Sequence, residues 1–162
     1  MSSVKVKICG VRDEETAVAA ARARADFVGV VFVPSSPRYV EPAVARRLAV
    51  AIADAGAIPV AVVRLPLEPE ARQALEAFSI VQFHGNESPA DLHAYKSLEC
   101  WKGLGFSPDS VGDWLAGGTA ARLVVEHPIR HEPLTMTCPL PSSWNSLSIS
   151  KGKTVQDLLA RD

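Results

Sequence analysis

Three side chains capable of acid–base or ion-pair chemistry stand near the predicted ends of strands in this sequence. Cys9 closes an alternating apolar and basic segment, and Gly10 follows it at once. In parallel β/α folds, functional groups gather at the carboxyl ends of strands. The amino terminus of a following helix also favours a thiolate. Cys9 is therefore a candidate base or nucleophile. The alternative is a small buried apolar residue, since free cysteine is often buried.

The other two candidates follow later strands. Arg38 lies beside Pro37 in a predicted strand-to-helix loop, where a rigid guanidinium suits a carboxylate or a phosphate. The alternative is a solvated arginine of a surface loop. His84 ends another predicted strand, directly before Gly85. Its imidazole is suited to titrate or to donate to a substrate oxygen, and a structural role in the loop is the alternative.

Strand-like and helix-like segments alternate along the first 126 residues. The predicted strands cover residues 4–8, 27–33, 58–63, 80–83, 100–104 and 121–126. The predicted helices cover residues 13–25, 41–55, 68–78, 89–98 and 108–115. Strict alternation implies a parallel sheet with right-handed crossovers. Units this short favour a (β/α) barrel over a dinucleotide-binding sheet, and no G-x-G-x-x-G motif follows the first strand.

The regular pattern stops after Glu126. Residues 127–150 are rich in Pro, Ser and Thr, and residues 154–161 are suited to one short helix. A complete barrel typically needs roughly 200 residues, whereas this chain has 162. We expect one domain, residues 1–162, that forms an incomplete TIM-type α/β barrel with an irregular tail at residues 127–162. The first and sixth strands would then have open edges, and three outcomes stay open: the tail folds back over the gap, two chains complete each other as a homo-oligomer, or the sheet stays open under its helices.

Composition excludes several classes of function. The formal net charge is −1 and no run of like charges occurs, which argues against a nucleic-acid partner or an anionic membrane. The sequence contains neither a long apolar span nor a signal-peptide core, so we expect a cytoplasmic protein with no membrane partner. The three cysteines, Cys9, Cys100 and Cys138, lack metal-ligand spacing. We therefore expect neither disulfides nor a metal site.

Three stretches in register resemble one enzyme family. They are "VKICG" at the first strand, "SPRYV" after the second and "VQFHGNE" at the fourth. Together they resemble phosphoribosylanthranilate isomerase, a single-domain (β/α)8 barrel of tryptophan biosynthesis, an aromatic amino-acid pathway. The resemblance extends over residues 4 to about 105, and Lys102 stands where the family often has a lysine. It implies an isomerase without a cofactor. The phosphorylated small substrate, N-(5′-phosphoribosyl)anthranilate, would become 1-(2-carboxyphenylamino)-1-deoxyribulose 5-phosphate by an Amadori rearrangement.

The resemblance also implies a role for each candidate residue. Cys9 corresponds to the general base, Arg38 to the group that binds the anthranilate carboxylate, and His84 to a residue lining the substrate pocket. Glu126 stands where the family has an aspartate as general acid. Its longer side chain displaces the acidic proton, and a misplacement of about 1 Å can cost on the order of 10²-fold in rate.

The family's later glycine-rich segments, which bind the substrate phosphate, have no counterpart in this sequence. Two other interpretations therefore stay open. One is a catalytically inactive relative that binds a small ligand or serves in assembly. The other is a broken gene product with an out-of-frame tail, which would explain the abrupt loss of the pattern after Glu126.

Overall fold

The computed structural model describes residues 5–105, 108–126, 148–149 and 153–154. Within them, one sheet contains eight strands in sequential order. The strands are β1 (Lys7–Cys9), β2 (Phe27–Val31), β3 (Ile58–Val63), β4 (Ile80–Phe83), β5 (Glu99–Gly105), β6 (Arg122–Glu126), β7 (Ser148–Ile149) and β8 (Lys153–Thr154). The helices are α1 (Glu14–Arg22), α2 (Pro42–Asp54), α3 (Pro69–Ala74) and α4 (Pro108–Gly117), with the 3₁₀ helices η1 (Leu75–Ala77) and η2 (Pro89–Tyr95).

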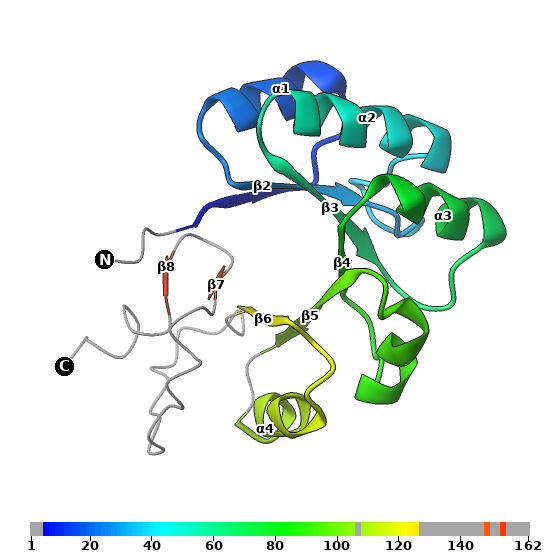
Figure 1. Ribbon diagram of the computed structural model, residues 1–162, viewed down its shortest axis with the longest axis vertical. Helices are drawn as coiled ribbons and strands as arrows, with labels where there is room; N and C mark the ends of the chain where they lie inside the picture. Colours follow the sequence, from blue (N-terminus) through cyan, green and yellow to red (C-terminus); the bar gives the residue numbers. More distant parts are fainter. Residues whose placement is uncertain (1–4, 106–107, 127–147, 150–152, 155–162) are drawn as a thin grey trace.

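The sheet is a partial barrel. Strands β1 to β7 pair in parallel, and β8 pairs antiparallel to β7. Figure 1 shows the sheet curving, with the helices along its outer side. The predicted incomplete TIM-type α/β barrel is therefore confirmed. Alternation of strand and helix produces this parallel sheet, because each helix returns the chain to the end of the sheet at which the strands begin.

Most predicted elements correspond to observed ones, with differences at their ends. The first strand begins and ends later than the predicted residues 4–8, and Cys9 is the last residue of β1. Helix α1 starts where Asp13 accepts a hydrogen bond from the Thr16 amide at 2.8 Å. The predicted helix at residues 89–98 is the 3₁₀ helix η2. The predicted helix at residues 154–161 and most of the predicted tail lie outside the described residues.

The open edge expected for the sixth strand is covered, because β7 pairs with β6, Val124 with Ser148 and Val125 with Ile149. Of the three alternatives, this pairing fits a tail that folds back over the gap. Strand β7 has only two residues, too few for an alternating pattern to reveal it in the sequence. Among the described residues, β1 pairs with β2 alone.

Successive side chains of each strand point to opposite faces of the sheet, and this produces two apolar clusters. The outer cluster packs beneath the helices and includes Val28, Ala61 and Val81. The inner cluster consists of Phe27, Val60, Ile80, Trp101 and Val124. The rings of Phe27 and Trp101 meet edge to face, with centroids 4.9 Å apart. The inner cluster fills the inner face before the strands reach their carboxyl ends.

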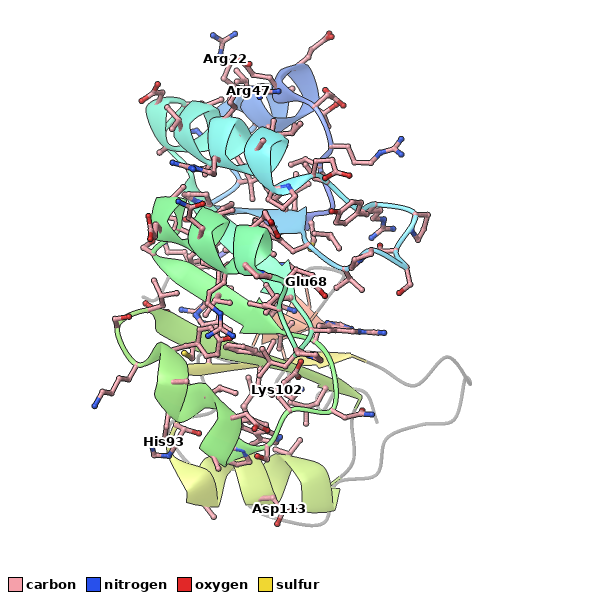
Figure 2. The ribbon with its side chains drawn as sticks, turned by 90° about the vertical axis from the view of Figure 1, so that its right-hand side faces the viewer. Arg22, Arg47, Glu68, His93, Lys102 and Asp113 are labelled. Carbon is pink, nitrogen blue, oxygen red and sulfur yellow. The ribbon has the colours of Figure 1, made fainter. Side chains whose placement is uncertain are left out.

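A buried ion pair lies between strand β5 and the loops that follow β3 and β4. Lys102 lies in the interior between the sheet and α4 (Figure 2), with its Nζ 2.7 Å from Glu87 Oε2 and 5.5 Å from the Trp114 ring centroid. It also donates to the Gly85 carbonyl at 2.6 Å. Glu87 accepts the amide hydrogens of Gly85 at 2.8 Å and of Leu65 at 3.1 Å. The pair therefore fixes the loops that follow β3 and β4 to strand β5.

The surroundings of Glu87 keep its carboxylate ionised. Burial, the largest single influence, raises the pKa of Glu87. The hydrogen bonds from Lys102 and from the backbone amides of Leu65 and Gly85 together outweigh burial, so this pKa lies below its ordinary value. A carboxyl whose pKa is lowered on folding stabilises the folded state above its ordinary pKa. That contribution is lost as the pH falls through the lowered value.

Replacing Glu87 with Gln should lower the free energy of unfolding at neutral pH by about 3 kcal/mol or more, since it leaves the Lys102 charge buried without its partner. Denaturant titration would measure the difference. It should shrink as the pH falls below about 4.5, the ordinary Glu value, because the wild-type carboxyl takes up its proton first in the unfolded chain and, at its lowered pKa, in the folded protein as well.

Glu76 provides the matched control, because it is an exposed carboxylate of η1. Glu76→Gln should change the free energy of unfolding by less than about 0.5 kcal/mol. Equal stability of Glu87→Gln and the wild type would contradict the structural role of the pair. So would a difference between them that stays constant down to strongly acid pH.

Candidate functional site

The register of the sheet places Cys9 on the inner face. Phe27 belongs to the inner cluster, so two residues later Gly29 faces the same side, and Cys9 is the pairing partner of Gly29. The Cys9 Sγ lies only 2.7 Å from where a Cβ on Gly29 would be. The thiol is exposed. The missing side chain at Gly29 therefore leaves room for the sulfur at the open rim of the inner face.

The structure brings Arg38 next to the cysteine. Gly10 follows Cys9 and has a φ of +87°. The Arg38 side chain packs against Gly10: a Cβ built at this glycine would lie 3.3 Å from both the Cγ and the Nε of Arg38. The loop carrying Arg38 returns to β2, where Tyr39 forms a bridge with Val31. A thiol and a guanidinium thus come from neighbouring strand ends.

His84 follows β4 on the same inner face. Gln82 precedes it by two residues, pairs with Trp101 of the inner cluster, and has its Nε2 3.4 Å from the His84 Nδ1. A Cβ on Gly103 would lie 2.6 Å from that Nδ1, so the imidazole lies across Gly103. Sequence analysis missed Gln82, which is 3% exposed. Its place two residues before His84 is the signal that would have found it.

A pocket of about 390 Å³ opens at the ends of β3, β4 and β5. That volume lies within the range of small-molecule sites, roughly 300–1,000 Å³. The lining residues are Arg64, Leu65, His84, Gly85, Asn86, Gly103, Leu104 and Gly105. Arg64 donates from Nε to the His84 carbonyl at 2.9 Å. Sequence analysis missed Arg64, although it directly follows the apolar run of the third strand.

Glu126 is the last residue of β6 and pairs with Gly105. Its backbone is therefore level with the pocket rim, and its side chain lies outside the described residues. Cys9 and Arg38 do not line the pocket that contains His84. The structure thus joins Cys9 with Arg38 and His84 with Arg64, as two pairs at the carboxyl ends of the strands.

Two further properties of the described residues bear on ligands and location. No group of three or more His, Cys, Asp or Glu side chains is arranged to hold a metal ion within them. None of the described helices combines the length and the apolar composition needed to cross a lipid bilayer.

The comparison with known proteins points to one family. The family model described as N-(5′-phosphoribosyl)anthranilate (PRA) isomerase matches residues 6–124. The N-(5′-phosphoribosyl)anthranilate isomerase of Cereibacter sphaeroides is 40% identical over 119 residues, which are 67% of this chain and 53% of that protein. The chain spans about half the length of the curated relatives it matches.

Solved structures agree with this result. Monomers generated from the dimeric phosphoribosylanthranilate isomerase of Thermotoga maritima match with a TM-score of 0.67 and 26% identity, covering 80% of this chain and 68% of that one. A phosphoribosylanthranilate isomerase in complex with reduced 1-(o-carboxyphenylamino)-1-deoxyribulose 5-phosphate matches with a TM-score of 0.61 and 25% identity, covering 78% and 77%. Because the family model covers residues 6–124 of 162, the chain belongs to the N-(5′-phosphoribosyl)anthranilate isomerase family.

Proposed function

We propose that this chain isomerises N-(5′-phosphoribosyl)anthranilate to 1-(2-carboxyphenylamino)-1-deoxyribulose 5-phosphate, in the cytoplasm, as a step of tryptophan biosynthesis. The observation that carries the proposal is the position of Cys9 on the inner rim with the Arg38 side chain packed over the next residue. A base and a carboxylate-binding cation side by side suit an anthranilate ring whose amine nitrogen is bonded to the reacting sugar.

The proposed reaction needs one acid and one base. Glu126 protonates the ribose ring oxygen, the bond from C1′ to that oxygen breaks, and the nitrogen lone pair forms a protonated Schiff base. The Cys9 thiolate then removes the proton from C2′, and the electron pair moves to form a neutral enolamine. The enolamine becomes the ketone when C1′ takes up a proton and the C2′ hydroxyl loses one. No redox partner is required, because atoms and electrons are conserved within the substrate.

Arg38 and His84 bind substrate in this proposal. A guanidinium presents two parallel N–H donors to a carboxylate, which orients the anthranilate ring as well as attracting it. His84 lines the neighbouring pocket at the end of β4. Its ring position is set from beneath by Gly103 and from the side by Gln82. Both groups would hold the sugar close to the sulfur, and such positioning supplies a large part of enzymatic rate acceleration.

Binding without turnover is the second candidate function. The family match ends at residue 124, ahead of the part of the chain that would supply the family's phosphate-binding segments. A relative without those segments would still bind the substrate carboxylate at Arg38 and would lack the segments that bind the substrate phosphate. It would then serve as a small-ligand-binding or assembly protein.

Cys9→Ser should lower turnover of N-(5′-phosphoribosyl)anthranilate, generated in situ and followed by its loss of fluorescence, by roughly 10²- to 10⁴-fold, the usual contribution of a general base. Cys100→Ala is the matched control, because that thiol is buried on the outer side of the sheet and should leave turnover unchanged. A Cys9→Ser variant as fast as the wild type would contradict the role of the thiol. A folded but inactive wild type would favour the second candidate.

Gly10→Ala should raise the KM through displacement of Arg38, because the new methyl group would overlap the arginine side chain. Gly56→Ala is the matched control. Gly56 has a φ of +91°, close to that of Gly10, and a Cβ there would meet nothing within 4 Å. Both variants should lose about 1–3 kcal/mol of stability through backbone strain. Only Gly10→Ala should lose affinity, and equal KM values for the two variants would contradict the proposed carboxylate site.

We further propose that the chain forms a homo-oligomer. Among the described residues β1 pairs only with β2, and unpaired strand edges favour association with another chain. The Thermotoga maritima relative is named as a dimeric enzyme. Sedimentation equilibrium of the full chain should give a multiple of its 17.3 kDa mass. A single species of 17.3 kDa over a wide range of protein concentrations would contradict this proposal.

A further inference from the structure

The pocket at the ends of β3, β4 and β5 contains a positive charge that no described side chain balances. Arg64 is exposed at the pocket wall, and its Nε donates to the His84 carbonyl. That acceptor is neutral, so the hydrogen bond fixes the guanidinium without cancelling its charge. Within the described part of the chain, Arg64 forms no ion pair.

The acidic side chain of Glu87 lies close to Arg64 but pairs with a different cation. A Cβ placed on Gly85 would lie 2.6 Å from Glu87 Oε1 and 3.2 Å from Arg64 Cγ, so both side chains border the same glycine. Glu87 is nevertheless buried and bonded to Lys102 at 2.7 Å. The buried lysine neutralises Glu87, and none of the described carboxylates forms an ion pair with Arg64, so the Arg64 charge stays uncompensated at the pocket wall.

The rest of the lining suits an anion. None of the pocket-lining residues that the structure describes is acidic, while His84 and Asn86 contribute polar side chains to it. Gly103 and Gly105 contribute no side chains, and a Cβ on Gly105 would meet no atom of the described residues within 4 Å. An open floor next to a fixed guanidinium allows a planar carboxylate or a tetrahedral phosphate to approach the N–H donors of Arg64 that do not bond to the His84 carbonyl.

We propose that this pocket is a subsite for an anionic oxygen group of the ligand, a carboxylate or a phosphate, with Arg64 as its principal binding group. Only the choice of candidate anions rests on the proposed function, since N-(5′-phosphoribosyl)anthranilate carries one group of each kind. Arg38 lies outside the pocket lining. The inner rim thus presents two separate guanidinium groups, which matches a ligand with two anionic ends.

The test is a titration of the full-length protein, followed by amide nitrogen–proton NMR. The probes are anthranilate, for the carboxylate, and inorganic phosphate, each added at constant ionic strength because surface attraction is screened by salt. Either probe should cause saturable shifts at Gly85, Asn86 and Gly105. In Arg64→Gln, which removes the charge, the affinity should fall roughly 10- to 100-fold.

Arg47→Gln is the matched control. Arg47 is exposed on α2, donates to the Ala43 carbonyl of its own helix, and lies on the outer side of the molecule (Figure 2). Its replacement makes the same change in net charge and should leave the shifts and the affinity unchanged. Arg64→Lys keeps the charge but loses the paired donors, so its affinity should lie between those of the wild type and Arg64→Gln.

Each outcome decides the matter. Saturable shifts with anthranilate alone assign the subsite to a carboxylate, with phosphate alone to a phosphate, and with both to either group. Absence of saturable binding at the pocket, or equal affinity of Arg64→Gln and the wild type, would overturn the proposal. The measurement needs no turnover. Anion binding through Arg64 in a protein without activity would support this inference and contradict the proposed function. Turnover in a protein whose anion affinity does not depend on Arg64 would support the proposed function and contradict this inference.

Discussion

The buried pair of Lys102 and Glu87 is the constraint on which the arrangement of the pocket depends. Removing two ions from water is costly unless each finds an opposite charge and further hydrogen bonds. Here the lysine also donates to the Gly85 carbonyl, and the carboxylate accepts two backbone amides from two different loops. Those contacts tie the loop after β4 to strand β5. They consequently determine where His84 and Arg64 stand, because both are joined to that loop.

Glycines on the inner face supply the second condition. A glycine inside a strand removes a side chain and weakens the strand, and here two such positions lie beneath functional groups. Gly29 leaves room for the Cys9 sulfur, and Gly103 leaves room for the His84 ring. The inner cluster around Trp101 compensates further down the face, where the side chains are large and buried. The inner face is thus filled by large side chains at the level of Trp101 and has room for functional groups nearer the carboxyl ends of the strands.

The sequence predicted the fold class and the strand ends better than it predicted the site. Apolar runs with short connections marked β3 and β4, and the alternation of residues placed Cys9 and His84 at strand ends. Gln82, Arg64 and Glu87 were missed because their roles depend on contacts across strands. The Glu87 carboxylate pairs with Lys102, 15 residues further along the chain, and the local pattern of residue types does not indicate a contact at that separation. Strand β7 was missed because two residues show no period.

The sign of the charge at the pocket follows from which cation meets Glu87. If the carboxylate paired with Arg64, the pocket wall would be neutral and the lysine would be an unbalanced charge in the core. Burial decides against that arrangement: Lys102 is 3% exposed and must have a counter-ion, whereas Arg64 is exposed and solvated without one. The least costly pairing therefore leaves the guanidinium as the uncompensated group. A buried lysine of the core thereby determines the sign of the charge that this rim presents.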